Sequence, residues 1–316
     1  MRNSIRSLLL FCTCAILVQG AFGQTDNAQT GNAASDVTKT TIDAGRGDIP
    51  FIIPASYDGD APTPLIVLLH GYGSSGERQD SYMKFSVLAN RYGFLLATPD
   101  GTEEAAGDKN RYWNASKACC NFFGSEQDDS AYVLSIIDSV KKAYRVDERR
   151  VYLIGHSNGG FMSFRAAYDH SDVIAGIASL AGSEATDAQA APANPVHVLQ
   201  IHGTADGTIA YAGSDIRGNT YPGAVETVER WAAYNGCAPE GSVIATLDLE
   251  RELAGLETTA TRYGSGCKAG GSSELWTIAE GAHIPALSDT FSEKVVEWLL
   301  ARQKIVSADA PTSSAD

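Results

Sequence analysis

Short runs of apolar residues recur along this chain, and segments with helical spacing lie between them. The runs fall at 64–69, 94–98, 151–154, 174–180, 196–201 and 274–278. They show no clean alternation of apolar and polar positions, which is typical of strands covered on both faces. Helical spacing marks 78–92, 129–144, 161–169, 224–235 and 289–302. This alternation predicts a single α/β domain with a doubly wound, mostly parallel sheet and helices on both faces.

The two ends of the chain differ in composition from this alternating core. Residues 1–23 combine two arginines, an apolar stretch and a small-residue exit, which indicates a secretory signal peptide. The apolar stretch is too short to span a bilayer comfortably. Polar composition predicts a disordered leader at 24–39 and a flexible tail at 306–316. The folded domain is therefore expected at 40–305, in a protein that is extracellular, or periplasmic in a host with an outer membrane.

The chain is acidic, with 38 Asp and Glu residues against 24 Lys and Arg residues. Its formal net charge of −14 becomes −16 if the signal peptide, with its two arginines and no acidic residue, is removed. This charge argues against nucleic acids and anionic membrane surfaces as partners and favours an uncharged substrate. We expect a monomer that does not insert into membranes.

The segment 155–159, GHSNG, follows one of the predicted strands and precedes a predicted helix. A G-x-S-x-G turn in that context holds its serine in a strained backbone conformation, with the hydroxyl exposed above the sheet. The alternative is an ordinary turn with a surface serine, since the pattern also occurs by chance. The flanking strand and helix favour the first interpretation. Ser157 is therefore the candidate nucleophile of a serine hydrolase.

A glycine-rich loop, HGYGSSG at 70–76, follows the strand predicted at 64–69. Ligands of doubly wound sheets bind beyond the carboxyl ends of the strands, where this loop lies. In serine hydrolases of this architecture, an amide from such a loop joins the amide that follows the nucleophile to bind an oxyanion. We expect these two amides to be those of Tyr72 and Asn158. The alternative is a flexible connector.

The segment 202–206, HGTAD, follows the strand predicted at 196–201, so Asp206 is the candidate acid of a triad. Its alternative role is to form a turn with the glycine that follows. We expect His202 to pack or form a hydrogen bond beneath this loop. The base should come last in the order Ser, Asp, His, and His283 satisfies that order. A separation of 77 residues from Asp206 predicts an insertion between acid and base.

Four cysteines remain after removal of the signal peptide: Cys119, Cys120, Cys237 and Cys267. An even number in a secreted chain indicates disulfide bonds. A bond between Cys237 and Cys267 closes a span of 30 residues, and the loop-entropy treatment gives it about 3–4 kcal/mol. Cys119 and Cys120 could then pair with each other or stay reduced. The spacing of histidines and cysteines matches no zinc motif, so we expect no metal and no cofactor.

Taken together, these motifs resemble a known family, the secreted esterases of the polyhydroxybutyrate-depolymerase type, which include feruloyl and acetylxylan esterases of carbohydrate esterase family 1. The resemblance runs from about Pro64 to Leu300. It is carried by HGYG at 70–73, ACC at 118–120 followed by DD at 128–129, GHSNGG at 155–160, HGTAD at 202–206, WAAYNGC at 231–237 and GAH at 281–283. It implies an α/β-hydrolase fold, a Ser157–Asp206–His283 triad and no cofactor.

One departure from the family concerns the residue after the predicted base. Many feruloyl- or polymer-active members have a Trp-Pro pair there, whereas this chain has Ile284 and Pro285. This chain therefore lacks the aromatic side chain beside the predicted base, which argues against docking of an aromatic acyl group or a polymer. Four aromatic residues follow strand ends or lie in loops and are candidates to line a substrate cleft, with packing as the alternative: Tyr72, Trp113, Phe122 and Phe123.

The sequence therefore predicts a secreted serine esterase that hydrolyses small or polymeric carboxylic esters. The resemblance points to polyhydroxybutyrate-type polyesters or to feruloyl and acetyl esters of plant cell walls. A serine peptidase is one alternative, because the same triad serves both reactions. A noncatalytic α/β-hydrolase-like binding protein is another. Such proteins usually lack a triad member, whereas this chain has all three.

Overall fold

The structure is a computed structural model that describes residues 37–185 and 191–305. The predicted signal peptide, the predicted tail and residues 24–36 of the predicted leader lie outside the described residues. The first strand begins at Thr38, two residues before the expected start of the folded domain.

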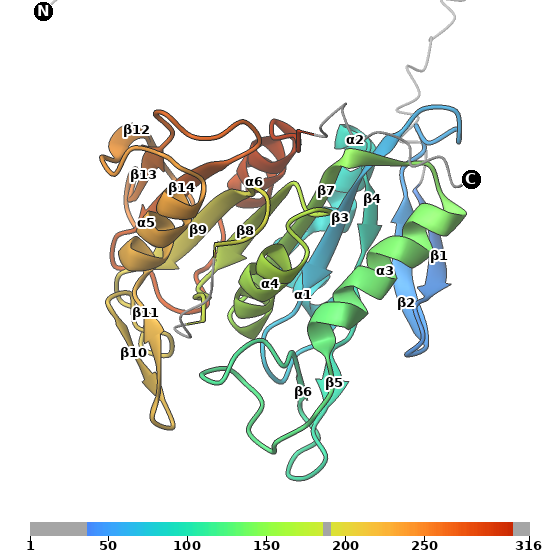
Figure 1. Cartoon of the computed structure of the whole chain (residues 1–316), viewed down its shortest axis with the longest axis horizontal. Helices are drawn as coiled ribbons and strands as arrows, with labels where there is room; N and C mark the ends of the chain where they lie inside the picture. Colours follow the sequence, from blue (N-terminus) through green and yellow to red (C-terminus); the bar gives the residue numbers. More distant parts are fainter. Residues whose placement is uncertain (1–36, 186–190, 306–316) are drawn as a thin grey trace, which may run out of the picture. The chain divides into compact units, whose positions relative to one another are not determined.

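The described chain forms a ten-stranded sheet with helices on both faces (Figure 1). Its strands are β1 (Thr38–Asp43), β2 (Asp48–Ile53), β3 (Thr63–Leu69), β4 (Leu95–Ala97), β7 (Val146–His156), β8 (Gly176–Leu180), β9 (His197–Gly203), β12 (Ser242–Leu247), β13 (Thr258–Tyr263) and β14 (Ser272–Ile278). Two small sheets pair β5 (Thr102–Glu103) with β6 (Arg111–Tyr112) and β10 (Gly213–Ile216) with β11 (Asn219–Pro222). The helices are α1 (Gly76–Met83), α2 (Phe85–Tyr92), α3 (Asp129–Ala143), α4 (Asn158–Asp169), α5 (Ala224–Tyr234) and α6 (Phe291–Leu300).

The order of strands across the large sheet is β1-β2-β4-β3-β7-β8-β9-β14-β13-β12. The six strands from β4 to β14 run parallel, and they are the six strands that the apolar runs predict. The two strands at each edge are antiparallel. The doubly wound, mostly parallel α/β-hydrolase architecture predicted from the sequence is confirmed.

Each face of the sheet is covered by its own set of helices. Side chains of β3 such as Val67 pack with α3 and α4 on one face, whereas Ile66 packs with α1, α2 and α6 on the other. Helix α5 lies on the first face, with Trp231 in its core. Because both faces are covered, the central strands are mainly apolar and largely buried.

The prediction of a single helix at 78–92 is wrong, because the structure has two helices there. Lys84 lies between α1 and α2 in the left-handed region, with φ 56° and ψ 34°. Its amide donates to the Asp80 carbonyl and closes α1. The Asp80 side chain accepts from the amide of Ser86 in the first turn of α2, at 2.9 Å. One aspartate therefore ends one helix and caps the next.

Candidate active site

Ser157 lies in the tight turn between the end of β7 and the start of α4. Its backbone has φ 54° and ψ −118°, a conformation that L-residues rarely adopt. The Ser157 amide donates to the Leu180 carbonyl at 2.8 Å, and its carbonyl accepts from the Phe161 amide at 3.0 Å. These bonds hold the turn in its strained shape, which is typical of functional sites. The serine therefore lies at the carboxyl edge of the parallel strands, where the sequence predicts it.

The structure brings the three residues of the predicted triad into hydrogen-bond contact. His283 Nε2 lies 2.9 Å from Ser157 Oγ, and His283 Nδ1 lies 2.8 Å from Asp206 Oδ2. An ionised carboxylate accepts only, so the Nδ1 proton points to Asp206 and leaves Nε2 free to accept from the serine hydroxyl. This arrangement can activate a serine as a nucleophile.

Asp206 is held by four donors. Its Oδ1 accepts the amides of Thr208 and Ile209, both at 2.8 Å. Its Oδ2 accepts from His283 and also lies 3.2 Å from Nε2 of His202. Burial alone raises the pKa of the Asp206 carboxyl, but the hydrogen bonds from His202 and His283 outweigh it and hold that pKa well below its usual range. The carboxylate is therefore ionised at neutral and mildly acidic pH.

His202 supports this carboxylate, a contact that the sequence interpretation missed. Its Nδ1 accepts from the Gln200 amide at 2.9 Å, so its Nε2 carries the proton that faces Asp206 and the Ile209 carbonyl. The sequence offered a signal, because His202 ends a strand four residues before the acid. The predicted position beneath the loop is correct.

The loop that carries His283 is fixed by a second histidine, His156. The His156 Nε2 lies 2.9 Å from the carbonyl oxygen of His283 and donates to it. The centroid of the His156 ring also lies 5.7 Å from that of Tyr82 and 5.2 Å from that of His283. The residue before Ser157 in the G-x-S-x-G motif thus helps to hold the loop of the predicted base.

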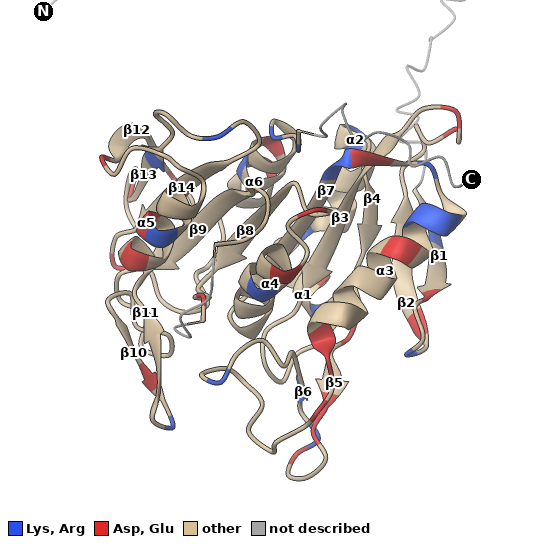
Figure 2. Cartoon of the chain, viewed as in Figure 1, with Lys and Arg blue, Asp and Glu red and all other residues tan. Residues whose placement is uncertain are grey.

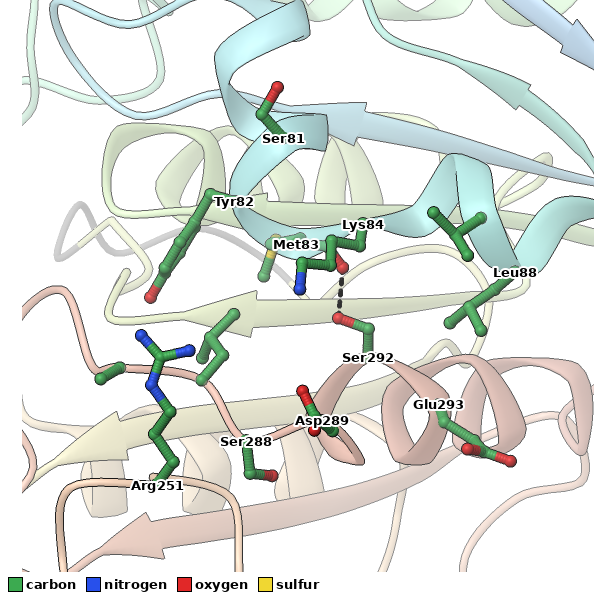
Figure 3. Close-up of a pocket in the computed structure, with 13 residues that line it drawn as sticks. Ser81, Tyr82, Met83, Lys84, Leu88, Arg251, Ser288, Asp289, Ser292 and Glu293 are labelled. Carbon is green, nitrogen blue, oxygen red and sulfur yellow. Dashed lines mark hydrogen bonds between the residues drawn. The ribbon is translucent and has the colours of Figure 1, made fainter.

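A cavity of about 330 Å³ lies between the α1–α2 corner and the chain that follows His283 (Figure 3). Tyr82 and Arg251 both line it, and Ser292 donates to the Met83 carbonyl at its edge. The Tyr82 hydroxyl donates to the Pro285 carbonyl at 2.7 Å. The wall of this cavity therefore helps to hold the loop of the predicted base.

The buried ring of His156 makes the stability of the protein sensitive to acid. Burial lowers the pKa of His156 to about 4, below the ordinary value of 6.5. A histidine with a lowered folded pKa stabilises the protein fully above the unfolded pKa and loses that contribution as pH falls to the folded pKa. We expect the free energy of unfolding to fall by up to about 3 kcal/mol from this group between pH 6.5 and pH 4. Urea denaturation at a series of pH values measures it.

His156→Gln, which cannot titrate, is expected to flatten this pH dependence. His197 provides the matched control, because burial also lowers the pKa of His197 to about 4. His197 begins β9, so it lies at the opposite end of that strand from Asp206. His197→Gln should flatten the same curve without changing ester turnover. If the curves of both variants follow that of the native protein, this account of acid sensitivity is wrong.

The loop from His70 to Ser74 lies against Ser157. A Cβ placed on Gly71 would lie 3.5 Å from the Ser157 Cβ. The amides of Gly71, Gly73 and Ser74 each donate to an acceptor within the protein. Among the hydrogen bonds of the described residues, none uses the amide of Tyr72.

The amide of Asn158 is the first of helix α4, where amides have no acceptor within the helix. No hydrogen bond in the described part of the chain uses it. The helix dipole makes this end favourable for negative charge. The Asn158 side chain holds the backbone of Trp113 through two hydrogen bonds, at 2.7 and 2.9 Å. Neither of the two amides predicted to bind an oxyanion therefore has an acceptor among the described residues.

Trp113, predicted to line a substrate cleft, lies beneath the site instead. Its side chain is fully buried, and its Nε1 donates to the His70 carbonyl at 3.0 Å. A loop aromatic near a strand end looks the same in sequence whether it faces solvent or packs under the loop. Phe122 is half-buried with its ring 5.4 Å from that of Tyr72, and Phe123 is exposed.

Two disulfide bonds are present in the described chain. Cys237 is joined to Cys267, as the sequence predicts. Cys119 is joined to Cys120, which was one of two open alternatives. Cys119 Sγ accepts from the Asn158 side chain at 3.5 Å, so the second bond lies beside the turn that holds Ser157.

Neither a metal site nor a membrane-spanning helix is found among the described residues. Within residues 37–185 and 191–305, no three His, Cys, Asp or Glu side chains are grouped so that they could hold a metal ion. None of the helices described there is long and apolar enough to cross a membrane.

Comparison with known proteins gives consistent matches. Feruloyl esterase B of Piromyces equi is 30% identical over 196 residues, which are 59% of this chain and 35% of that protein. The bifunctional acetylxylan esterase/xylanase XynS20E of Neocallimastix patriciarum is 32% identical over 169 residues, which are 53% of this chain and 22% of that protein. The chain thus spans about a third or less of the length of these two relatives.

Among solved structures, an acetyl xylan esterase from Aspergillus awamori matches with a TM-score of 0.57 at 14% identity, over 83% of this chain and 98% of that one. At that identity the likeness concerns the fold. The family described as esterase PHB depolymerase matches residues 54–233, more than half of the chain and the span that holds Ser157 and Asp206. This chain belongs to the PHB depolymerase family of esterases.

Proposed function

We propose that this protein is a secreted serine esterase that hydrolyses carboxylic esters in two steps through an acyl-enzyme. The observation that carries the proposal is the pair of contacts from His283, 2.9 Å to Ser157 Oγ and 2.8 Å to Asp206 Oδ2. The strained backbone of Ser157 supports it, because strain of this kind clusters at functional sites. Membership of an esterase family supports an ester as the substrate.

In the first step, Ser157 Oγ attacks the ester carbonyl carbon while its proton passes to His283 Nε2. Asp206 holds the imidazole in the required tautomer and stabilises its charged form. The carbonyl oxygen becomes an oxyanion between the amides of Tyr72 and Asn158, and removing one such donor typically costs about 10²–10³ in rate. The bond to the alcohol oxygen then breaks, and the Nε2 proton passes to the departing alcohol.

In the second step, a water molecule takes the place of the alcohol. His283 Nε2 accepts a proton from the water as its oxygen attacks the acyl carbon. The same two amides stabilise the second oxyanion, and its collapse returns the proton to Ser157 Oγ. The acid is released and the serine is regenerated.

The proposed substrates are polyhydroxybutyrate-type polyesters or the feruloyl and acetyl esters of plant cell walls. The names of the relatives favour the cell-wall esters. The side chain beside the proposed base is Ile284, which is 64% exposed, so a small apolar surface is available to a substrate there. Secretion is supported by the two disulfide bonds, which persist in oxidising compartments.

Labelling with a fluorophosphonate probe tests the proposed nucleophile. The probe should form one adduct per native molecule, and peptide mass spectrometry should place it on Ser157. Ser163→Ala is the matched control, because the Ser163 hydroxyl is buried and donates to the Gly159 carbonyl. That variant should label normally. An adduct on another serine, or p-nitroanilide turnover as fast as p-nitrophenyl ester turnover, would contradict the proposed esterase.

A further inference from the structure

The turn of the β10–β11 hairpin contacts the loop beside the proposed active site. Arg217 occupies this turn, and its guanidinium carbon lies 4.1 Å from the centroid of the Phe122 ring. Figure 2 shows the turn in the blue of a basic residue. A guanidinium over an aromatic face is attracted by the ring and is held in a defined orientation. Arg217 is therefore placed by its contact with Phe122, although it is on the surface.

Phe122 links Arg217 to the proposed oxyanion loop. The Phe122 ring lies 5.4 Å from that of Tyr72, with the rings edge to face. The Tyr72 hydroxyl donates to the buried Glu104 carboxylate, which fixes the other side of that ring. The backbone next to Tyr72 lies against Ser157. A continuous set of contacts thus runs from Arg217 to the nucleophile.

The charge of Arg217 is not matched by a carboxylate. No ion pair among the described residues includes it. Asp215, on the same hairpin, accepts the Gly218 amide at 2.9 Å. The Glu104 carboxylate is engaged with Tyr72 and Asn110. A guanidinium that is held in one orientation and has no ion-pair partner can bind a carboxylate through two parallel hydrogen bonds.

A cavity of about 240 Å³ lies beside this turn, between Ser116–Ala118 on one side and Gly218–Thr220 on the other. It leaves open space next to the turn that Arg217 occupies.

We propose that Arg217 is a specificity residue that binds a carboxylate of the substrate remote from the scissile ester. The preferred substrates are then esters whose acid or alcohol part carries a free carboxylate, such as short linear oligomers of a hydroxy acid. The inference rests on the proposed function and names its substrate class. The net charge disfavours polyanions, but a single carboxylate within about 10 Å of Arg217 feels that cation most strongly.

Matched pairs of esters that differ only in this charge test the inference. The first pair is p-nitrophenyl hydrogen adipate and its primary amide, with the charge on the acyl side. The second is the linear dimer of 3-hydroxybutyrate and its primary amide, with the charge on the alcohol side. Each is compared by kcat/KM in the native enzyme, Arg217→Gln, Arg217→Lys and Arg149→Gln. Arg149 is a control for net charge, because it is exposed and lies near the opposite end of β7 from Ser157.

In at least one pair, the native enzyme should prefer the acid, and added salt should weaken that preference. Arg217→Gln should lower kcat/KM for that acid about tenfold, which is the size expected for one lost charge-assisted contact, and for its amide less than about twofold. Arg217→Lys should keep part of the preference, and Arg149→Gln all of it.

Two results overturn the inference alone. One is an unchanged acid-to-amide ratio in both pairs for Arg217→Gln. The other is an equal loss of kcat/KM for the acid and its amide, which would mean that Arg217 holds the hairpin in place and does not bind the substrate carboxylate. Native enzyme that fails to hydrolyse p-nitrophenyl butyrate overturns the proposed function, and the inference with it.

Discussion

Ser157→Ala is expected to lower kcat for p-nitrophenyl butyrate by about 10⁶-fold, the loss seen when the serine of such a triad is removed. The hydroxyl contributes the attacking oxygen, and no other hydroxyl is recorded within hydrogen-bond distance of His283 in the described chain. Any remaining acceleration should come from the amides of Tyr72 and Asn158, which the substitution leaves in place. Endpoint assays at high enzyme concentration are needed to measure so small a rate.

The same substitution should change stability little. Ser157 Oγ has one recorded partner, His283, and a lost hydrogen bond of this kind costs about 1 kcal/mol. Thermal unfolding should therefore move by only a few degrees. Full turnover by a correctly folded Ser157→Ala protein would remove Ser157 from the mechanism.

Gly159→Ala is expected to cost at least about 3 kcal/mol of folding free energy and most of the activity. A Cβ on Gly159 would lie 2.3 Å from the Leu69 carbonyl oxygen and 2.7 Å from that of His70. Both are backbone atoms, so either the start of α4 or the end of β3 must move. That movement separates the Asn158 amide from the loop that carries Tyr72. Urea denaturation and p-nitrophenyl butyrate turnover measure the two effects.

Gly207→Ala is the matched control for that substitution. Gly207 is adjacent to Asp206, but a Cβ placed there meets nothing within 4 Å, and its φ is not positive. Its stability should stay within about 0.5 kcal/mol of the native protein. If Gly159→Ala is as stable as Gly207→Ala, the close approach of α4 to β3 is not the constraint described above.

The sequence predicts the centre of this fold better than its edges. Strands buried on both faces, such as β3, carry mainly apolar residues on both faces, which leaves a nearly continuous apolar run in the sequence. The edge strand β1, Thr-Lys-Thr-Thr-Ile-Asp, is exposed except at Ile42 and leaves no such run. At the other edge, β12 is also largely exposed, and both edge pairs escaped prediction. The break at Lys84 was missed because the apolar spacing continues across it.

The candidate site, too, could be predicted only in part from the sequence. Ser157, Asp206 and His283 follow strand ends in the order that the architecture requires, so their proximity follows from topology. The contact from His156 to the His283 carbonyl joins residues 127 positions apart, and no local sequence pattern predicts it. Whether an aromatic residue lines or underlies a loop also depends on tertiary packing, as Trp113 illustrates.

The β10–β11 hairpin pairs only with itself and takes no part in the ladder of the large sheet. Its base is anchored by the buried Tyr221, which accepts the Ala210 amide at 2.9 Å, whereas residues 217–220 of its tip are exposed. Selection experiments that randomise the tip should therefore yield mostly folded proteins, because few buried groups are disturbed. With the proposed role of Arg217, this hairpin is a place where substrate range can be redirected in the laboratory while the sheet and the turn at Ser157 stay unchanged.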